Sequence, residues 1–221
     1  MPRYTLVIGN KNYSSWSLRS WLLMQQMGIE FEEVRVPLYS GAYKDELRKY
    51  SPSGKVPVLL DGQLAVWDSL AIAEYLAEQH PDRGLWPADP GRRAVARSIS
   101  AEMHSGFSAL RSHMSMNCRG HFPGRGRTVE VAADIDRIQR IWTQCRAQCA
   151  GGGPFLFGAF GIADAMYAPV VLRFKTYVVP LSPPAQEYAD AILALAPLRQ
   201  WIDAAKAETE VIAAFEPAAT P

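Results

Sequence analysis

Short apolar runs alternate with amphipathic segments through the first 80 residues. The short runs end in Gly, Asn or Pro and are typical of strands, whereas the longer segments carry apolar side chains at helical spacing. We expect strands at residues 4–8, 31–36, 56–60 and 64–67, and helices at residues 14–27, 42–50 and 69–79. Asp61-Gly62 is a hairpin turn signal. This order predicts a parallel βαβ unit joined to an antiparallel ββα unit in one four-stranded mixed sheet, covered by helices.

After residue 90 the periodic segments are all helical. One apolar stripe passes through Ile99, Met103, Gly106, Phe107, Leu110 and Met114. A second stripe, over residues 131–149, steps by four and three residues alternately, which is typical of an amphipathic helix. Further helices are expected at residues 163–174, 184–196 and 197–207.

A proline-rich segment separates the two patterns and has the composition of an interdomain linker. The sequence therefore predicts an α/β domain over residues 1–80, a linker over residues 81–91 and an all-helical domain over residues 92–221. Residues 216–221 are rich in Ala and Pro, and we expect them to be frayed.

Composition narrows the class of protein. The 221 residues include 23 Lys and Arg against 22 Asp and Glu, a formal net charge of +1, which argues against a nucleic-acid partner bound by bulk charge. The apolar runs are too short for a membrane span, and three cysteines cannot all pair with one another. No apolar segment of signal-peptide length follows Met1, so we expect a cytoplasmic protein.

The turn around Pro57 is the first candidate site. Lys55, Val56 and Pro57 follow Gly54 and lead into a strand. A cis Val56–Pro57 bond would turn the Val56 backbone N–H and C=O outward, where they can pair with an extended peptide. An ordinary trans proline is the alternative, because only about 5–6% of X–Pro bonds are cis; the neighbouring motifs favour the cis form.

The second candidate lies where a strand meets a helix, at Asp68-Ser69. These residues can simply cap the helix. In a functional interpretation, the Ser69 hydroxyl and the free N–H groups of the first turn accept a ligand carboxylate, while Asp68 takes the ligand's ammonium group. An amino acid presents that pair of charges.

The third candidate is the loop after the first strand, where Tyr13, Ser14 and Ser15 gather hydroxyls at a helix N-terminus. One serine can be a cap and its neighbours solvated. Alternatively, a hydroxyl donates to a substrate thiolate. A free thiol has a pKa of about 8.5 and is mostly protonated at neutral pH, so a donor and the helix dipole would both favour the anion.

Together these motifs resemble the soluble glutathione S-transferases, over nearly the whole chain. Residues 53–59 are similar to the family's turn with its cis proline, and Asp68-Ser69 to its motif for the γ-glutamyl group. Residues 158–164 are similar to a capping motif of its helical domain, with Gly161 where Ser or Thr is usual; Asp164 can still bond the free N–H groups there. The resemblance implies a thioredoxin-like N-terminal domain, an all-α C-terminal domain and a homodimer.

The first-helix motif Ser14-Ser15-Trp16-Ser17 is similar to that of the zeta class. On this resemblance Ser14 is the catalytic serine and Ser15 its helper, with Tyr13 as a competing thiol activator. Trp16 stands where the zeta class has cysteine, which argues against the zeta isomerase activity and against cysteine-dependent thiol transfer. No permanently bound cofactor or metal is implied; glutathione is the co-substrate, held by Lys55, Val56, Pro57, Asp68 and Ser69.

Candidates for an electrophile site come from the helical domain and from Trp16. His104, Phe107 and Arg111 follow one another at helical spacing, and Arg111 would polarise an acidic substrate. Arg173 and Lys175 form another basic group. For each of these residues the alternative is a partly buried helix with satisfied polar side chains.

The cysteines suggest little chemistry. Cys145 and Cys149 lie on an apolar stripe without further ligands at metal spacing, which indicates a core position and makes zinc improbable. Cys118 lies in a loop and is a candidate free reactive thiol.

The sequence therefore predicts a glutathione S-transferase that joins the glutathione thiolate to a small electrophile. Two alternatives stay open. One is a non-catalytic glutathione-binding or dimerising module, which Trp16 crowding the sulfur pocket would favour. The other is a glutathione-dependent isomerase or peroxidase.

Overall fold

The computed structural model describes residues 2–149 and 152–216. Its N-terminal part contains one four-stranded sheet in the order β2-β1-β3-β4. The strands are β1 (Tyr4–Ile8), β2 (Phe31–Arg35), β3 (Val58–Asp61) and β4 (Leu64–Trp67). β1 is parallel to β2 and antiparallel to β3, and β3 is antiparallel to β4, which confirms the predicted mixed sheet.

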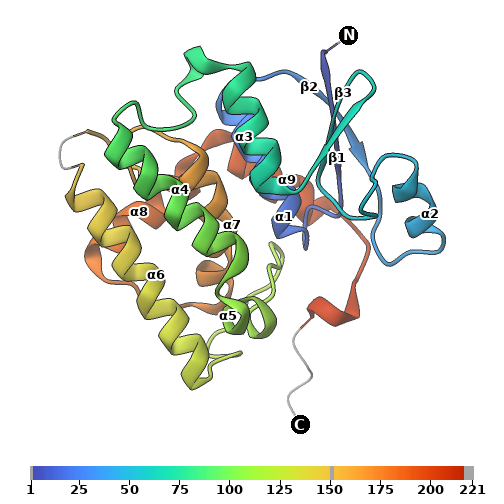
Figure 1. Ribbon diagram of the computed structural model, residues 1–221. Helices are drawn as coiled ribbons and strands as arrows, with labels where there is room; N and C mark the ends of the chain where they lie inside the picture. Colours follow the sequence, from blue (N-terminus) through green and yellow to red (C-terminus); the bar gives the residue numbers. More distant parts are fainter. Residues whose placement is uncertain (1, 150–151, 217–221) are drawn as a thin grey trace.

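Three helices accompany this sheet: α1 (Ser15–Gln26), α2 (Tyr43–Arg48) and α3 (Ser69–Gln79). Figure 1 shows α1 and α3 on the side of the sheet that faces the remaining helices, and α2 beyond the opposite side. Leu47 of α2 packs with Val7 of β1 and Val58 of β3 in a small separate core. Both faces of the sheet are covered, as its apolar strands require.

The regular secondary structure in the rest of the described chain is helical, apart from isolated bridges near residue 157. A short 3-10 helix, η1 (Pro81–Arg83), leads into α4 (Pro90–Ser105), α5 (Ser108–His113), α6 (Val129–Ala147), α7 (Ile162–Tyr177), α8 (Pro183–Ala194), α9 (Ala196–Ala207) and η2 (Ala213–Phe215). α7 is buried along nearly its whole length and contacts α1, α4 and α8. One large apolar core therefore runs from the sheet through α1 and α7 into the helical domain. Ala150, Gly151 and residues 217–221 of the expected frayed terminus lie outside the described residues.

The predicted continuous stripe over residues 99–114 is wrong in one respect. α4 ends at Ser105 and α5 begins at Ser108, with Phe107 in the left-handed region at φ 54°. A Cβ on Gly106 would lie 2.7 Å from the Glu102 carbonyl oxygen, so the chain can turn here only with glycine. Apolar residues keep a helical spacing across this break, so the sequence pattern alone does not reveal that the helix ends.

Asp164 closes the start of α7. One carboxylate oxygen accepts the Gly161 N–H at 2.9 Å and the other accepts the Leu156 N–H at 3.1 Å. Both contacts are made by a side chain that is only 1% exposed. The helix start thus keeps its capping function although Gly161 has no side chain to contribute. Over the described residues, no helix combines the length and apolar character that a membrane crossing needs.

Candidate functional site

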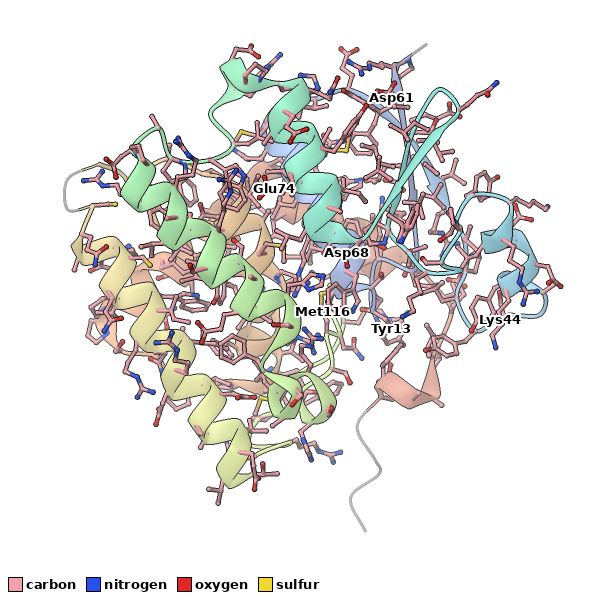
Figure 2. The ribbon with its side chains drawn as sticks, viewed as in Figure 1. Tyr13, Lys44, Asp61, Asp68, Glu74 and Met116 are labelled. Atoms are coloured by element: carbon pink, nitrogen blue, oxygen red, sulfur yellow. The ribbon has the colours of Figure 1, made fainter. Side chains whose placement is uncertain are left out.

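A cavity of about 390 Å³ opens where the sheet domain meets the helical domain. Its walls come from the start of α1, the α2 region, the turn before β3, α5 with the segment after it, α7 and the C-terminal segment. The lining residues are Tyr13, Ser14, Ser15, Trp16, Leu38, Tyr39, Tyr43, Leu47, Gly54, Lys55, Val56, Arg111, Ser115, Met116, Arg173 and Phe215. Figure 2 shows Tyr13, Asp68 and Met116 at this boundary between the two parts of the chain.

The turn before β3 presents unpaired backbone to this cavity. The Val56–Pro57 bond is cis, as the motif suggested, and β3 begins directly after it. Ser51 holds the turn because its hydroxyl accepts the Lys55 N–H at 3.1 Å and donates to the Lys55 carbonyl at 2.8 Å. Within residues 2–149 and 152–216, neither the N–H nor the C=O of Val56 has a hydrogen-bond partner. An extended peptide can pair with both groups.

Two buried serine hydroxyls stand at the start of α1. Ser14 is the N-cap; its oxygen accepts the Ser17 N–H at 3.3 Å, and its hydroxyl donates to the Ser17 oxygen at 2.8 Å. The Ser17 oxygen also accepts the Gly9 N–H at 3.1 Å, so it keeps a partner if Ser14 rotates away. The Ser15 oxygen accepts a hydrogen bond from buried Arg173 at 3.2 Å. Both serines line the cavity, and they are 7% and 8% exposed.

Tyr13 lines the same cavity, but its hydroxyl is already engaged. It donates to Glu216 at 2.5 Å and accepts from Arg119 at 2.9 Å. Burial, followed by the hydrogen bond to Glu216, raises the pKa of Tyr13. The Asn117 amide donates to the same Glu216 oxygen at 3.0 Å and holds that carboxylate in place. A phenol bound in this way is poorly placed to donate a proton to a thiolate.

Asp68 and Ser69 begin α3 and do not line the 390 Å³ cavity. Asp68 has φ 75° and caps the helix, accepting the Leu70 N–H at 2.9 Å and the Ala71 N–H at 3.4 Å, while its other oxygen lies 2.7 Å from His104 Nε2. Burial raises the pKa of Asp68, but these hydrogen bonds outweigh it, and the net pKa lies below the ordinary value. The carboxylate is therefore anionic at neutral pH, and the side chain is 41% exposed.

The Ser69 hydroxyl beside Asp68 is buried and has no hydrogen-bond partner among the residues that the structure describes. A buried hydroxyl without a partner costs about 1–3 kcal/mol. Because Ser69 is only 1% exposed, its hydroxyl can donate to a ligand carboxylate only after a local shift at the start of α3.

Cationic side chains surround Trp16. The guanidinium groups of Arg19 and Arg111 lie 4.3 and 4.7 Å from the centre of its ring, and the His104 ring meets it edge-on at 5.3 Å. Burial lowers the pKa of Arg19 to about 9, with further lowering from Arg111 and Arg173, and it lowers that of Arg173 to about 10. Over the described chain, none of these arginines forms an ion pair with a carboxylate. The excess positive charge favours an anionic occupant.

The electrophile-site residues inferred from helical spacing do not share one helix face. The break at Gly106 separates His104 on α4 from Arg111 on α5, and Phe107 between them is buried in the core. Arg111 lines the cavity and donates to the carbonyls of Met103 and His104 at 3.2 and 3.0 Å. His104 lies at Asp68 instead of on the cavity lining.

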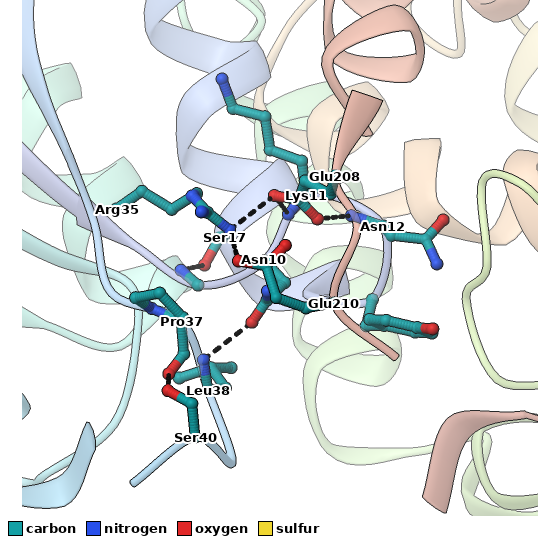
Figure 3. Close-up of polar contacts among 12 residues, drawn as sticks. Asn10, Lys11, Asn12, Ser17, Arg35, Pro37, Leu38, Ser40, Glu208 and Glu210 are labelled. Atoms are coloured by element: carbon teal, nitrogen blue, oxygen red, sulfur yellow. Dashed lines mark hydrogen bonds and ion pairs between the residues drawn. The ribbon is translucent and has the colours of Figure 1, made fainter. Parts of the chain in front are cut away.

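The C-terminal segment forms a wall that sequence reasoning missed. The Glu208 carboxylate accepts the N–H groups of Lys11 and Asn12 at 2.7 and 3.0 Å, which ties the segment to the loop after β1 (Figure 3). Phe215 then packs against Tyr13 at 5.9 Å and Tyr39 at 5.7 Å between ring centres. Phe215 occurs in an Ala-rich tail, and that isolated aromatic residue was the only available signal.

The cysteines lie outside this chemistry. Burial raises the pKa of Cys118 to about 12 and that of Cys145 to about 11, so both thiols stay protonated at neutral pH. The interpretation of Cys118 as a reactive thiol is therefore not supported. Cys145 and Cys149 are buried, as expected of core residues. Among the described residues, no group of three His, Cys, Asp or Glu side chains could hold a metal ion.

Family models match both parts of the chain. The glutathione S-transferase N-terminal domain matches residues 13–79, and the glutathione S-transferase C-terminal domain matches residues 128–204.

Curated relatives extend the match. A probable maleylacetoacetate isomerase of Caenorhabditis elegans is 41% identical over 174 residues, which are 76% of this chain and 78% of the relative. Glutathione S-transferase Z2 of Arabidopsis thaliana is 32% identical over 187 residues, 78% of this chain and 80% of the relative.

Solved structures share the fold. A glutathione transferase homologue from Burkholderia gl BGR1 with bound glutathione has a TM-score of 0.69 at 23% identity, covering 93% of this chain and 99% of that one. A theta class glutathione S-transferase from Xanthomonas axonopodis pv. citri with bound glutathione has a TM-score of 0.63 at 22% identity, covering 91% and 98%.

Proposed function

The chain belongs to the glutathione S-transferase family, whose members are enzymes, and on this basis we propose that it joins the glutathione thiolate to a small electrophile. In this proposal the Ser14 hydroxyl stabilises the thiolate. The observation that carries the proposal is the cavity itself, which brings the Ser14 hydroxyl and the unpaired backbone of Val56 to one space.

Glutathione offers groups that complement each part of the site. Its cysteinyl backbone pairs with the Val56 N–H and C=O, as an added strand would. Its γ-glutamyl end carries an ammonium for the exposed, anionic Asp68 and a carboxylate for the Ser69 hydroxyl and the first turn of α3. A peptide held at both places brings its sulfur to the start of α1.

The reaction follows from stabilising the sulfur anion. The thiol proton leaves to solvent, and Ser14 rotates from Ser17 to donate its hydrogen bond to the thiolate, with the dipole of α1 adding to the effect. The sulfur lone pair then forms a bond to the electrophilic carbon. The displaced electron pair goes to the leaving group, or to the electron-withdrawing group of an acceptor double bond.

The cationic cluster indicates an acidic electrophile. Arg111 and Arg173 line the cavity. Trp16 also lines it, and its ring packs against the guanidinium groups of both Arg111 and Arg19. A carboxylate on the electrophile would satisfy donors that lack a carboxylate partner within the described chain.

Removing one of these charges should change substrate preference. For Arg111→Met we expect kcat/KM to fall about 10- to 100-fold for a carboxylated electrophile, because a hydrogen bond to a charged group contributes about 1.5–3 kcal/mol. A neutral electrophile of the same reactivity should change less than about threefold. Steady-state kinetics with the matched pair of electrophiles measures the difference, and equal losses for both would contradict the acidic specificity.

Glutathione-dependent isomerisation is a second candidate function, favoured by the relatives named maleylacetoacetate isomerase and by the paired arginines. The thiolate would add to a conjugated double bond, the bond would rotate, and the thiolate would leave again. Isomerisation consumes no glutathione, whereas conjugation consumes one molecule per turnover. A thiol assay during turnover of an unsaturated acid separates the two reactions.

Calorimetric titration of the chain with glutathione, followed by turnover of a general electrophile, tests the proposal. We expect saturable binding at a single site per chain and a rate that saturates with glutathione. No heat of binding together with no turnover would contradict it.

Tyr13→Phe is expected to change kcat less than about threefold, because the hydroxyl it removes is bound to Glu216 and Arg119. Steady-state kinetics at saturating glutathione provides the measurement. A loss of about 100-fold would transfer the role of thiol activator from Ser14 to Tyr13.

We also propose that the protein is a homodimer. β4 is an edge strand, and its Leu64 and Trp67 side chains are 50% and 47% exposed. Apolar side chains of this size on an open sheet edge are typical of surfaces that meet a partner. Sedimentation equilibrium should give twice the 24.5 kDa chain mass.

A further inference from the structure

We propose that His104, a residue of the helical domain, is a positioning residue for the glutathione site, because it orients the Asp68 carboxylate toward the ligand's ammonium group. The inference rests on the proposed function. It gives His104 a place at the glutathione end of the site, in place of the role in holding the electrophile that the sequence suggested.

The two Asp68 oxygens have different partners. One accepts the backbone N–H groups of Leu70 and Ala71 and is committed to the start of α3. The other faces His104 Nε2 at 2.7 Å, so the imidazole fixes the direction of the oxygen that the helix leaves open. A carboxylate oxygen accepts more than one hydrogen bond, and at 41% exposure this side chain has room for an ammonium group as well.

His104 is itself held by both domains. Its ring packs edge-on against Trp16 of α1, and its carbonyl accepts a hydrogen bond from Arg111 of α5 at 3.0 Å. The His104 ring is therefore in contact with Trp16 on one side and with the Asp68 carboxylate at Nε2. Because His104 belongs to α4, the helical domain thereby holds the Asp68 carboxylate of α3 in one orientation.

Three variants of the full chain test the role. His104→Gln keeps an N–H donor that cannot ionise, His104→Leu removes the donor, and His113→Gln is the matched control. His113 is an exposed histidine of α5 whose Nδ1 lies 2.9 Å from the Ala109 carbonyl oxygen. The dissociation constant for glutathione is measured by calorimetry at pH 7.5, and kcat is measured at saturating glutathione.

We expect His104→Leu to raise the dissociation constant about three- to tenfold at pH 7.5, since binding must then order the carboxylate. His104→Gln should bind glutathione like the wild type, because its amide N–H can still donate to the Asp68 carboxylate, and His113→Gln should also bind like the wild type. kcat should change less than about twofold in all three, because His104 does not touch the sulfur.

A double variant tests whether His104 affects glutathione affinity through Asp68. In an Asp68→Asn background, substituting His104 should have no further effect on glutathione affinity, because the carboxylate through which it acts is gone.

The outcomes are distinguishable. If the wild type binds glutathione and both His104 variants match it, the role of His104 is wrong and the proposed function stands. If the wild type gives no heat with glutathione, the proposed function and this inference fail together.

Discussion

Ser14→Ala is expected to lower kcat about 10- to 100-fold and to raise the pKa of bound glutathione by one to two units. A hydrogen bond to a charged group contributes about 1.5–3 kcal/mol, and each pKa unit corresponds to about 1.4 kcal/mol. The Ser14 hydroxyl is the donor at the helix N-cap, where the dipole of α1 acts on the same sulfur. The measurement is the pH dependence of kcat for the variant and the wild type.

The two neighbouring hydroxyls supply the controls. Ser15 accepts a hydrogen bond from Arg173 and lines the same cavity, so Ser15→Ala should reduce kcat less than Ser14→Ala does. Tyr13→Phe should have the smallest effect. If Ser14→Ala leaves both turnover and sulfur ionisation unchanged, the assignment of the activating hydroxyl is wrong, and a large loss in Ser15→Ala would move it by one residue.

Asp164→Ala is expected to lower the free energy of unfolding by about 2–5 kcal/mol. The substitution leaves the Leu156 and Gly161 N–H groups without their acceptor, and each buried donor without a partner costs about 1–3 kcal/mol. Urea denaturation followed by circular dichroism measures the change. A loss below about 0.5 kcal/mol would show that the start of α7 does not depend on this carboxylate.

Asp164 should also make the free energy of unfolding depend on pH. Burial raises the pKa of Asp164 to about 7, although the N–H groups of Leu156 and Gly161 oppose the shift. The folded state then binds a proton that the unfolded chain releases near pH 4, so the stabilisation is complete below about pH 4 and is lost as the pH rises through 7. Compared with Asp164→Asn, the wild type should lose stability from pH 4 to pH 7. A constant difference between the two would contradict the shift.

The sheet was predictable because its signals are local. Short apolar runs, the Asp61-Gly62 turn and the helix caps act within a few residues, and they predicted a four-stranded mixed sheet. The strand order β2-β1-β3-β4 comes from the structure. The break between α4 and α5 was not predictable from periodicity. The apolar spacing continues through Gly106 and Phe107, and only the contact between Gly106 and the Glu102 carbonyl reveals why the helix stops.

The candidate site likewise contains residues that local motifs predict and residues that only tertiary packing brings there. Ser14, Val56 and Asp68 lie in compact motifs next to strand ends, and for this reason the sequence predicted them as site residues. Arg19 shows the limit: inside a helix it looks like a solvated cation, yet it is only 3% exposed, beside Trp16. Phe215 reaches the cavity from nearly 200 residues away, a contact that only tertiary packing creates.

The ultraviolet absorbance of glutathione bound to the wild-type chain tests the central claim most directly. When the complex is titrated between pH 5 and pH 9, the thiolate absorbance should give a thiol pKa at least one unit below that of free glutathione. Ser14→Ala should shift this pKa back toward the free value. Saturable binding with the ionisation of free glutathione would contradict the claim and favour a module that binds the peptide without activating it.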